Sequence, residues 1–178
     1  MKQRTIISIA LIIGIVVVDQ CVKHAVMNTM MLGEHTEVTS WFYICYTQNQ
    51  GMAFGMSFFG TWLLALLRIC AILGFGWYLM RCIRRRYPMG FVVCVTLIIA
   101  GAIGNIIDNV LGYGTGEWLN GRVTDMFYFP LFTWPDWVPL LHGRTFFGAV
   151  FNVADASISC AAIALLLFYG KFMTRNTK

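Results

Sequence analysis

Charged side chains are scarce in this sequence: Asp, Glu, Lys and Arg together make up 12% of its 178 residues. Soluble domains carry about a quarter of charged residues, so the shortage excludes an ordinary water-soluble domain. Hydrophobic residues reach 58%, and the mean hydropathy is +0.69. The composition therefore predicts a membrane protein.

Four apolar segments are long enough to cross a bilayer, which takes about 20 residues in a helix. They cover residues 5–27, 61–80, 89–111 and 151–172. We expect residues 1–178 to form a single integral membrane domain, an all-α bundle of four transmembrane helices. The two longer connections, residues 28–60 and 112–150, then lie on one side of the membrane.

Acidic residues are missing from the chain ends and from the short connection between the second and third segments. Nine of the 13 Lys and Arg residues lie in these places, and none of the eight acids does. By the positive-inside rule, we expect these places to be cytoplasmic and the two longer connections to face outward. The net charge of +5 then reflects topology and contact with anionic lipids. No basic patch with interleaved aromatic residues remains to indicate nucleic-acid binding.

Motifs of several hydrolase and redox classes are also absent. The six cysteines form no C-x-x-C pair and fall mostly inside apolar segments, so we expect no disulfide. The three histidines are scattered and no H-E-x-x-H sequence occurs, which argues against a metal hydrolase. No G-x-S-x-G sequence marks a nucleophilic serine.

The two outer connections differ in pattern. Residues 38–46 combine alternation with β-branched and aromatic side chains, which predicts a short strand or hairpin. Residues 112–150 contain three of the four prolines together with several Trp and Phe. Because Trp and Tyr favour the headgroup region, we expect this stretch to lie on the membrane surface.

Polar residues gather at one depth, near the outer ends of the apolar segments. They are Asp19, Lys23, Asn105, Asp108, Asn152 and Asp155, and Asp125 precedes the last segment. Ionisable groups in such positions are functional candidates. Structural roles remain open, because Asp19 and Lys23 have the spacing of a helical ion pair and Asp155 has the place of a helix cap.

Three other polar residues also have a structural interpretation. Asn105, which follows the small residues AGAIG at 100–104, fits close helix packing and interhelical hydrogen bonding. Asp108 fits a solvated helix end. Arg68 either pairs with an acid or extends to the interface, and the sequence assigns it no function.

Acid–base catalysis by a pair of aspartates is the mechanism that these residues leave open, and Asp125 and Asp155 are the candidate pair. Two carboxyls that share one proton have separated pKa values, so one accepts a proton from water while the other donates to a carbonyl oxygen. Such a pair cleaves amides without a cofactor. A proton-coupled carrier or channel and a structural subunit are the other classes left open, although acids gathered at one face argue against a relay across the membrane.

Five motifs occur in order around the four segments: DQCVK (19–23), NQGMAFG (49–55), AGAIGNIID (100–108), VTDMF (123–127) and FNVADASI (151–158). Together they resemble the lipoprotein signal peptidase family, also called signal peptidase II. The resemblance implies an aspartyl membrane protease that cuts the signal peptide from bacterial prolipoproteins just before a cysteine carrying diacylglycerol. It also implies four transmembrane helices, a small extracytoplasmic β-sheet cradle and an interfacial surface segment that covers the site.

Site residues and partners follow from the same resemblance. It implies that Asp125 and Asp155 are catalytic, with no metal and no cofactor. The implied supporting and substrate-binding positions are Asp19, Lys23, Asn49, Gly51, Gly104, Asn105, Arg122, Asn152 and Ala154. The implied partners are lipid-modified prolipoproteins and membrane lipids. We expect a monomer in the bacterial inner membrane, with both termini cytoplasmic and the active site at the outer face.

Two features depart from the family pattern. The family usually continues GN..DR, but Asn109 stands where that arginine would be, and we expect Arg122 to take over its role. The stretches 112–120 and 131–147 are longer than usual, which leaves the form of the covering segment open. We expect residues 49–55 to hold the substrate backbone and residues 132–141 to contact lipid.

Overall fold

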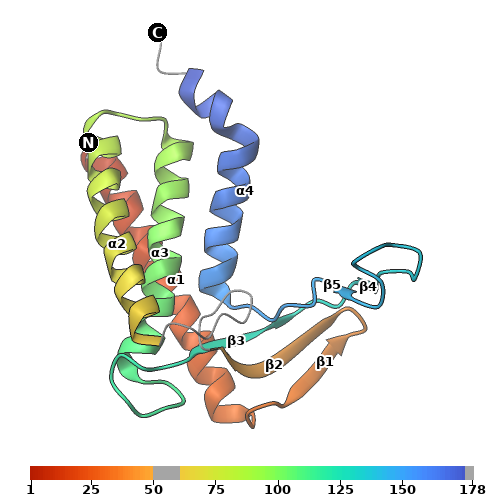
Figure 1. Cartoon of the computed structure of the whole chain (residues 1–178). Helices are drawn as coiled ribbons and strands as arrows, with labels where there is room; N and C mark the ends of the chain where they lie inside the picture. The colour runs from red at the N-terminus through yellow and green to blue at the C-terminus, as the bar shows by residue number, and fades with distance from the viewer. Residues whose placement is uncertain (50–60, 175–178) are drawn as a thin grey trace.

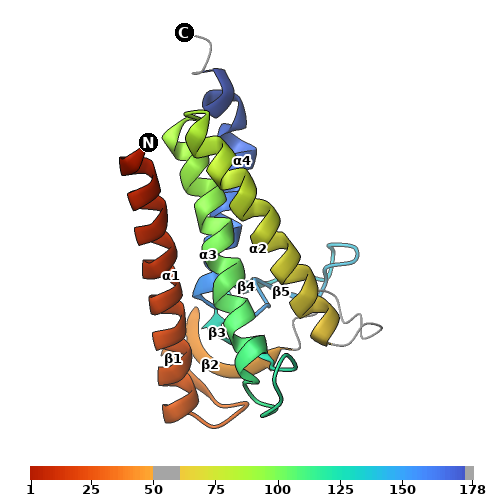
Figure 2. The ribbon, with the colours of Figure 1, turned by 90° about the vertical axis from the view of Figure 1, so that its left-hand side faces the viewer.

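The computed structural model describes residues 1–49 and 61–174. Four long helices run side by side, and the strands gather at one end of them (Figures 1 and 2). In chain order the elements are α1 (Lys2–Thr29), β1 (His35–Thr39), β2 (Phe42–Asn49), α2 (Thr61–Arg84), α3 (Met89–Leu111), β3 (Val123–Tyr128), β4 (Phe132–Thr133), β5 (Thr145–Phe146) and α4 (Val153–Thr174).

All four helices are long and apolar enough to span a bilayer. Helix α3 has the bounds expected from hydropathy, whereas α2 continues past residue 80 to Arg84. The extra turn carries Arg81 and Arg84, whose positive charges interact favourably with the dipole at a helix C-terminus. Helix α4 begins two residues later than the predicted segment, and Asn152 precedes its first turn.

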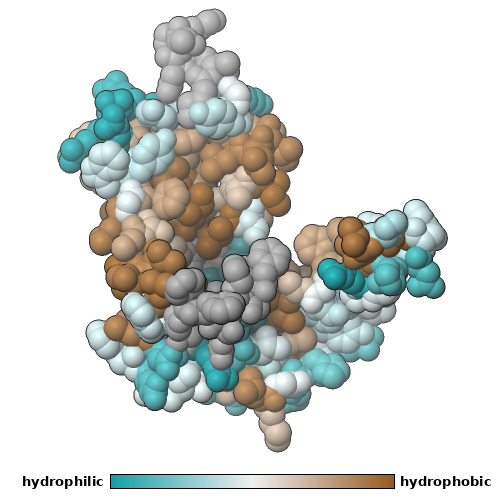
Figure 3. Space-filling model, viewed as in Figure 1, coloured by the Kyte–Doolittle hydropathy of each residue, from teal (hydrophilic) through white to brown (hydrophobic). Residues whose placement is uncertain are grey.

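Helix α3 is the central element, because it packs against α1, α2 and α4. It is largely buried, while α1, α2 and α4 expose apolar side chains such as Ile13, Leu73 and Leu166. Apolar residues cover the visible sides of the helices in Figure 3, and hydrophilic residues gather toward the two ends. This distribution is that of a protein whose helices face lipid.

Small residues on α3 bring α4 close. A Cβ atom added at Gly101 would lie 2.4 Å from the backbone oxygen of Ala154, and one at Gly104 would lie 2.9 Å from the Ala154 Cβ. Both distances are shorter than real Cβ atoms show, so no larger residue fits without displacement. The prediction that the AGAIG segment serves close helix packing is confirmed.

Strands β1, β2 and β3 form an antiparallel sheet in that order. The hairpin predicted around residues 38–46 is confirmed as β1 and β2. Strand β3 is also tied to the start of α4, because Phe127 and Phe151 exchange backbone hydrogen bonds. This link holds Asp125 of β3 beside the first turn of α4.

A second hairpin, formed by β4 and β5, lies within residues 131–147. The rings of Phe132 and Phe146 stack with their centroids 4.8 Å apart, while Trp137 and Leu140 are exposed. The hairpin projects to one side of the helices, beyond α4 (Figure 1). Exposed aromatic and apolar side chains at this end of the molecule suit a segment at the membrane interface.

Candidate active site

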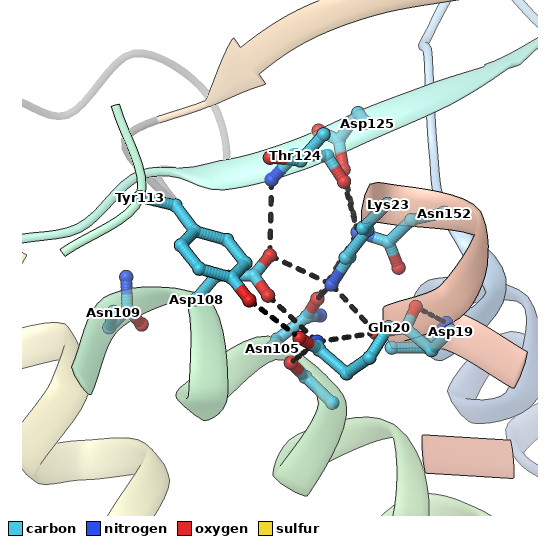
Figure 4. Close-up of polar contacts among 12 residues, drawn as sticks. Asp19, Gln20, Lys23, Asn105, Asp108, Asn109, Tyr113, Thr124, Asp125 and Asn152 are labelled. Carbon is cyan, nitrogen blue, oxygen red and sulfur yellow. Dashed lines mark hydrogen bonds and ion pairs between the residues drawn. The ribbon is translucent and has the colours of Figure 1, made fainter. Parts of the chain in front are cut away.

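The polar residues singled out from the sequence meet where α1, α3, β3 and the start of α4 come together (Figure 4). The fully or almost fully buried members are Asp19, Lys23, Asn105, Asp108, Asp125 and Asn152. Thr124 of β3, which was not singled out from the sequence, is buried beside them. Buried polar groups are costly unless they have partners. Every buried side-chain nitrogen and oxygen among the described residues has one.

Lys23 is the central cation of this cluster. Its Nζ lies 2.8 Å from Oδ2 of Asp19 on its own helix and 2.8 Å from Oδ2 of Asp108 on α3. The same Nζ donates a hydrogen bond of 3.2 Å to Oδ1 of Asn105. The expected ion pair between Asp19 and Lys23 is therefore present, and a second acid shares the cation.

Asp108 is not at a solvated helix end, so that interpretation is wrong. Its side chain is fully buried, and its Oδ1 accepts a hydrogen bond of 2.9 Å from Nε2 of Gln20. Its Oδ2 accepts from the backbone N–H of Thr124, 3.1 Å away, at the start of β3. Asp108 therefore joins α1, α3 and the sheet. Its position three residues after Asn105 puts both on one helical face, which is the signal that could have identified it.

The first turn of α4 is capped by other residues, not by the Asp155 carboxylate. Oδ1 of Asn152 accepts the backbone N–H of Asp155 at 2.8 Å, the usual bond from an N-cap residue to the third helical residue. Oδ1 of Asp19 accepts the N–H of Ala154 at 2.9 Å. The capping explanation of Asp155 is thus wrong, and its carboxylate is available for another role.

Two amide side chains connect Asp125 to Asp155. Asn152 Nδ2 donates to Oδ1 of Asp125 at 2.7 Å and to Oδ1 of Asn105 at 3.1 Å. Asn105 Nδ2 in turn donates to Oδ1 of Asp155 at 2.7 Å. Asn49, at the end of β2, also donates a hydrogen bond to the Asp125 carboxylate. The structure therefore brings both predicted catalytic residues into one network with five predicted supporting residues: Asp19, Lys23, Asn49, Asn105 and Asn152.

The environment of Asp125 favours its protonated form. Burial is the main cause, and the negative charge of Asp155 is the second, so that the pKa of Asp125 rises from 3.8 to about 7. The hydrogen bonds from Asn152 and Asn49 act in the opposite direction because they stabilise the carboxylate. Asp155 is only half-buried. One carboxyl that keeps its proton near neutral pH beside a second, more accessible one can perform acid–base chemistry on a water molecule.

Other predicted site residues have different positions. Gly104 lies against Asp19, since an added Cβ would be 2.8 Å from its Oδ2. Gly51, with residues 50–55 of the NQGMAFG motif, lies outside the described residues. Beside Asn109 the structure has an arginine other than Arg122: Arg68 of α2 donates a hydrogen bond from Nη1 to Oδ1 of Asn109. The role expected for Arg122 stays a prediction. The sequence left two alternatives for Arg68, pairing with an acid or extension to the interface, and its contact with Asn109 was not among them; the only signal was a charge inside an apolar segment.

Metal chemistry has no obvious site in this part of the molecule. Within residues 1–49 and 61–174, no group of three or more His, Cys, Asp or Glu side chains is arranged to hold a metal ion. Each of the six cysteines carries a free thiol.

Comparison with known proteins gives consistent matches. The family described as signal peptidase (SPase) II matches residues 11–171. A lipoprotein signal peptidase from Porphyromonas gingivalis is 42% identical over 90% of this chain and 81% of its own length. One from Streptococcus pneumoniae is 31% identical over 94% of each chain.

Two solved structures, each of a bacterial membrane enzyme, share the fold. One superposes with a TM-score of 0.69 at 22% identity and covers 96% of this chain and 92% of its own. The other has a TM-score of 0.66 at 24% identity and covers 90% of each chain.

Proposed function

This chain belongs to the signal peptidase II family, and from that premise we propose that Asp125 and Asp155 are the two catalytic aspartates with which it removes signal peptides from prolipoproteins. The observation that carries the proposal is the bridge of Asn152 and Asn105 between the two carboxyls. It holds an acid from a strand and an acid from a helix start within electrostatic influence of each other.

The chemistry divides between the two acids. Asp125, whose pKa is about 7, holds the proton, and the half-buried Asp155 acts as the base. The base takes a proton from water as the water oxygen attacks the scissile carbonyl carbon, and Asp125 donates its proton to the carbonyl oxygen. The peptide bond then breaks as the tetrahedral intermediate collapses, and a proton passes to the leaving nitrogen. Asn105 and Asn152 keep both carboxyls oriented during these transfers.

The substrate class follows from the family and the position of the site. The acids lie at the end of the helices that carries the sheet, so a signal helix beside α1–α4 would present its C-terminal end to them (Figure 1). We infer that the substrate carries a diacylglyceryl cysteine whose lipid stays in the bilayer at this level. Within the described helices the acids are Asp19, Asp108 and Asp155, all toward the end that carries the sheet, and they do not form a path across the membrane that would support a proton relay.

Asparagine variants of the two aspartates test the dyad. With a diacylglyceryl-modified prolipoprotein in detergent, Asp125→Asn and Asp155→Asn should each abolish cleavage, since Asn cannot exchange the proton. Glu117→Gln, which changes an exposed acid of the connection between α3 and β3, serves as the matched control and should cleave normally. A folded Asp125→Asn or Asp155→Asn protein that cleaves at the wild-type rate would overturn the assignment.

The positions of the basic residues bear on how the chain is oriented in the membrane. We propose that both termini are cytoplasmic, because basic residues gather at the end where α1 begins and α4 ends (Figure 1). We also propose a single membrane domain that acts as a monomer, because one chain supplies every residue of the network.

Proteolysis tests the orientation of the chain. Protease added outside spheroplasts should cut the loop at 134–144 but spare residues 85–88. The opposite pattern would reverse the orientation.

A further inference from the structure

Lys23 does not neutralise the proposed dyad directly. Among the described residues its ion pairs go to Asp19 and Asp108, and neither Asp125 nor Asp155 has a basic group within ion-pair distance. Four carboxyls and one buried amine would leave an excess of negative charge in a largely buried site. Such an excess opposes ionisation of the dyad, which needs one charged member to act as a base.

A second cation reaches this region from α2. Arg68 is half-buried, and the carboxyls of Asp155, Asp108 and Asp125 are close enough for its guanidinium to attract them electrostatically. The other arginines of α2 lie in its last turn, at the opposite end of the helix. Arg68 is thus the arginine of α2 that lies near the acids.

The side chain of Arg68 is anchored instead of extending freely to the interface. Its Nη1 donates to Oδ1 of Asn109, which is fully buried. Asn109 Nδ2 donates to the backbone oxygen of Gly121 at 2.6 Å, just before β3. The hydrogen bonds therefore connect α2 through α3 to the chain that leads to Asp125.

The residue that anchors Arg68, at position 109, differs from the family pattern. The family pattern that this sequence resembles would place an arginine there, on the central helix, whereas this chain has Asn109. We propose that Arg68 is a positioning residue for the Asp125–Asp155 dyad, supplying from α2 the positive charge that the family pattern places at 109. The inference rests on the proposed function of the dyad, and it adds a residue on a helix that contributes no other group to the site described above.

The expected effect is on the ionisation of the dyad. The charged groups around it are Asp19 and Lys23 from α1, Arg68 from α2 and Asp108 from α3. Removing one positive charge makes the first ionisation of the dyad harder, so the acid limb of the kcat/KM–pH profile should move to higher pH. A move of about one pH unit lowers kcat/KM about tenfold on that limb.

Four proteins test this inference: wild type, Arg68→Gln, Arg68→Lys and the double variant Arg68→Gln/Asn109→Arg. We expect Arg68→Gln to lower kcat and shift the acid limb, with KM for the lipidated precursor little changed. Arg68→Lys keeps the charge and should keep the limb in place. The double variant returns an arginine to position 109 and should recover most of the lost kcat.

The possible results are distinguishable. A wild-type kcat and pH profile in folded Arg68→Gln, or a change in KM alone, would overturn the role of Arg68. A folded double variant whose kcat is no higher than that of Arg68→Gln would overturn the claim that Arg68 supplies the charge of an arginine at position 109. Asp125→Asn and Asp155→Asn are run beside them: if these stay active, the proposed function fails, and if they are inactive while Arg68→Gln is normal, only the present inference fails.

Discussion

Removing the charge of Lys23 should cause a large loss of stability, because two carboxylates share this one amine. Its Nζ lies 2.8 Å from both Asp19 and Asp108, and the three side chains are fully buried. At an effective dielectric constant of about 20, each contact at this distance is worth about 6 kcal/mol before the cost of desolvation. Lys23→Met keeps the side-chain length but leaves both carboxylates without a cation. Breaking a buried pair on one side costs about 3–5 kcal/mol.

Thermal unfolding in detergent measures this loss. The thiols of Cys45, Cys82 and Cys94 are buried and free, so a thiol-reactive fluorophore labels them as the protein unfolds. For a chain of this size 1 kcal/mol corresponds to about 2–4 °C, so Lys23→Met should melt about 6–20 °C lower than the wild type. Lys171→Met, at an exposed lysine of α4, is the matched control and should change stability by less than about 0.5 kcal/mol.

A double variant separates charge from packing. In Lys23→Met/Asp19→Asn only Asp108 stays charged, and it keeps its hydrogen bonds from Gln20 and Thr124. Part of the lost stability should therefore return. An unchanged melting temperature in Lys23→Met, or a double variant no more stable than the single one, would refute the electrostatic explanation.

Three more outcomes are expected. Folded Asp125 keeps its proton to about pH 7, whereas the unfolded chain releases it near the ordinary carboxyl pKa of 3.8, so stability should fall between about pH 4 and 7 and then level off. Asp125→Asn should flatten this fall and be more stable than wild type by up to about 4 kcal/mol above pH 7, as pH-dependent melting would show. Gly104→Ala should lower the unfolding free energy by about 1–3 kcal/mol through overpacking, whereas Gly14→Ala, where nothing lies within 4 Å of an added Cβ, should not. Replacing residues 131–147 by a short Gly-Ser linker should slow cleavage of the lipidated precursor, and unchanged turnover would show that the second hairpin takes no part in holding it.

Properties that depend on one stretch of chain were predictable from the sequence. The four apolar segments, the order of basic and acidic connections and the first hairpin all follow from hydropathy or alternation within short windows. The pairing of Asp19 with Lys23 is of the same kind, because residues four apart on a helix face each other.

Predictions failed where contacts join distant parts of the chain. Asp108 was assigned to a solvated helix end, but Gln20, 88 positions away, bonds to its buried carboxylate. Asp155 had the place of a helix cap, but Asp19, 135 positions before Ala154, takes part of that role. Hydropathy and spacing give no signal for either contact.

The sequence by itself determined that this is a four-helix membrane protein with a set of acids near one side of the bilayer, because hydrophobic length and charge order are local properties. Only the tertiary structure decided how these acids share their partners. The small residues of α3 bring α4 close enough for Asn105 and Asn152 to join Asp125 to Asp155, and they let a carboxylate from α1 cap α4. Those bonds require groups from three helices and a strand to meet in one largely buried volume, and that meeting depends on packing.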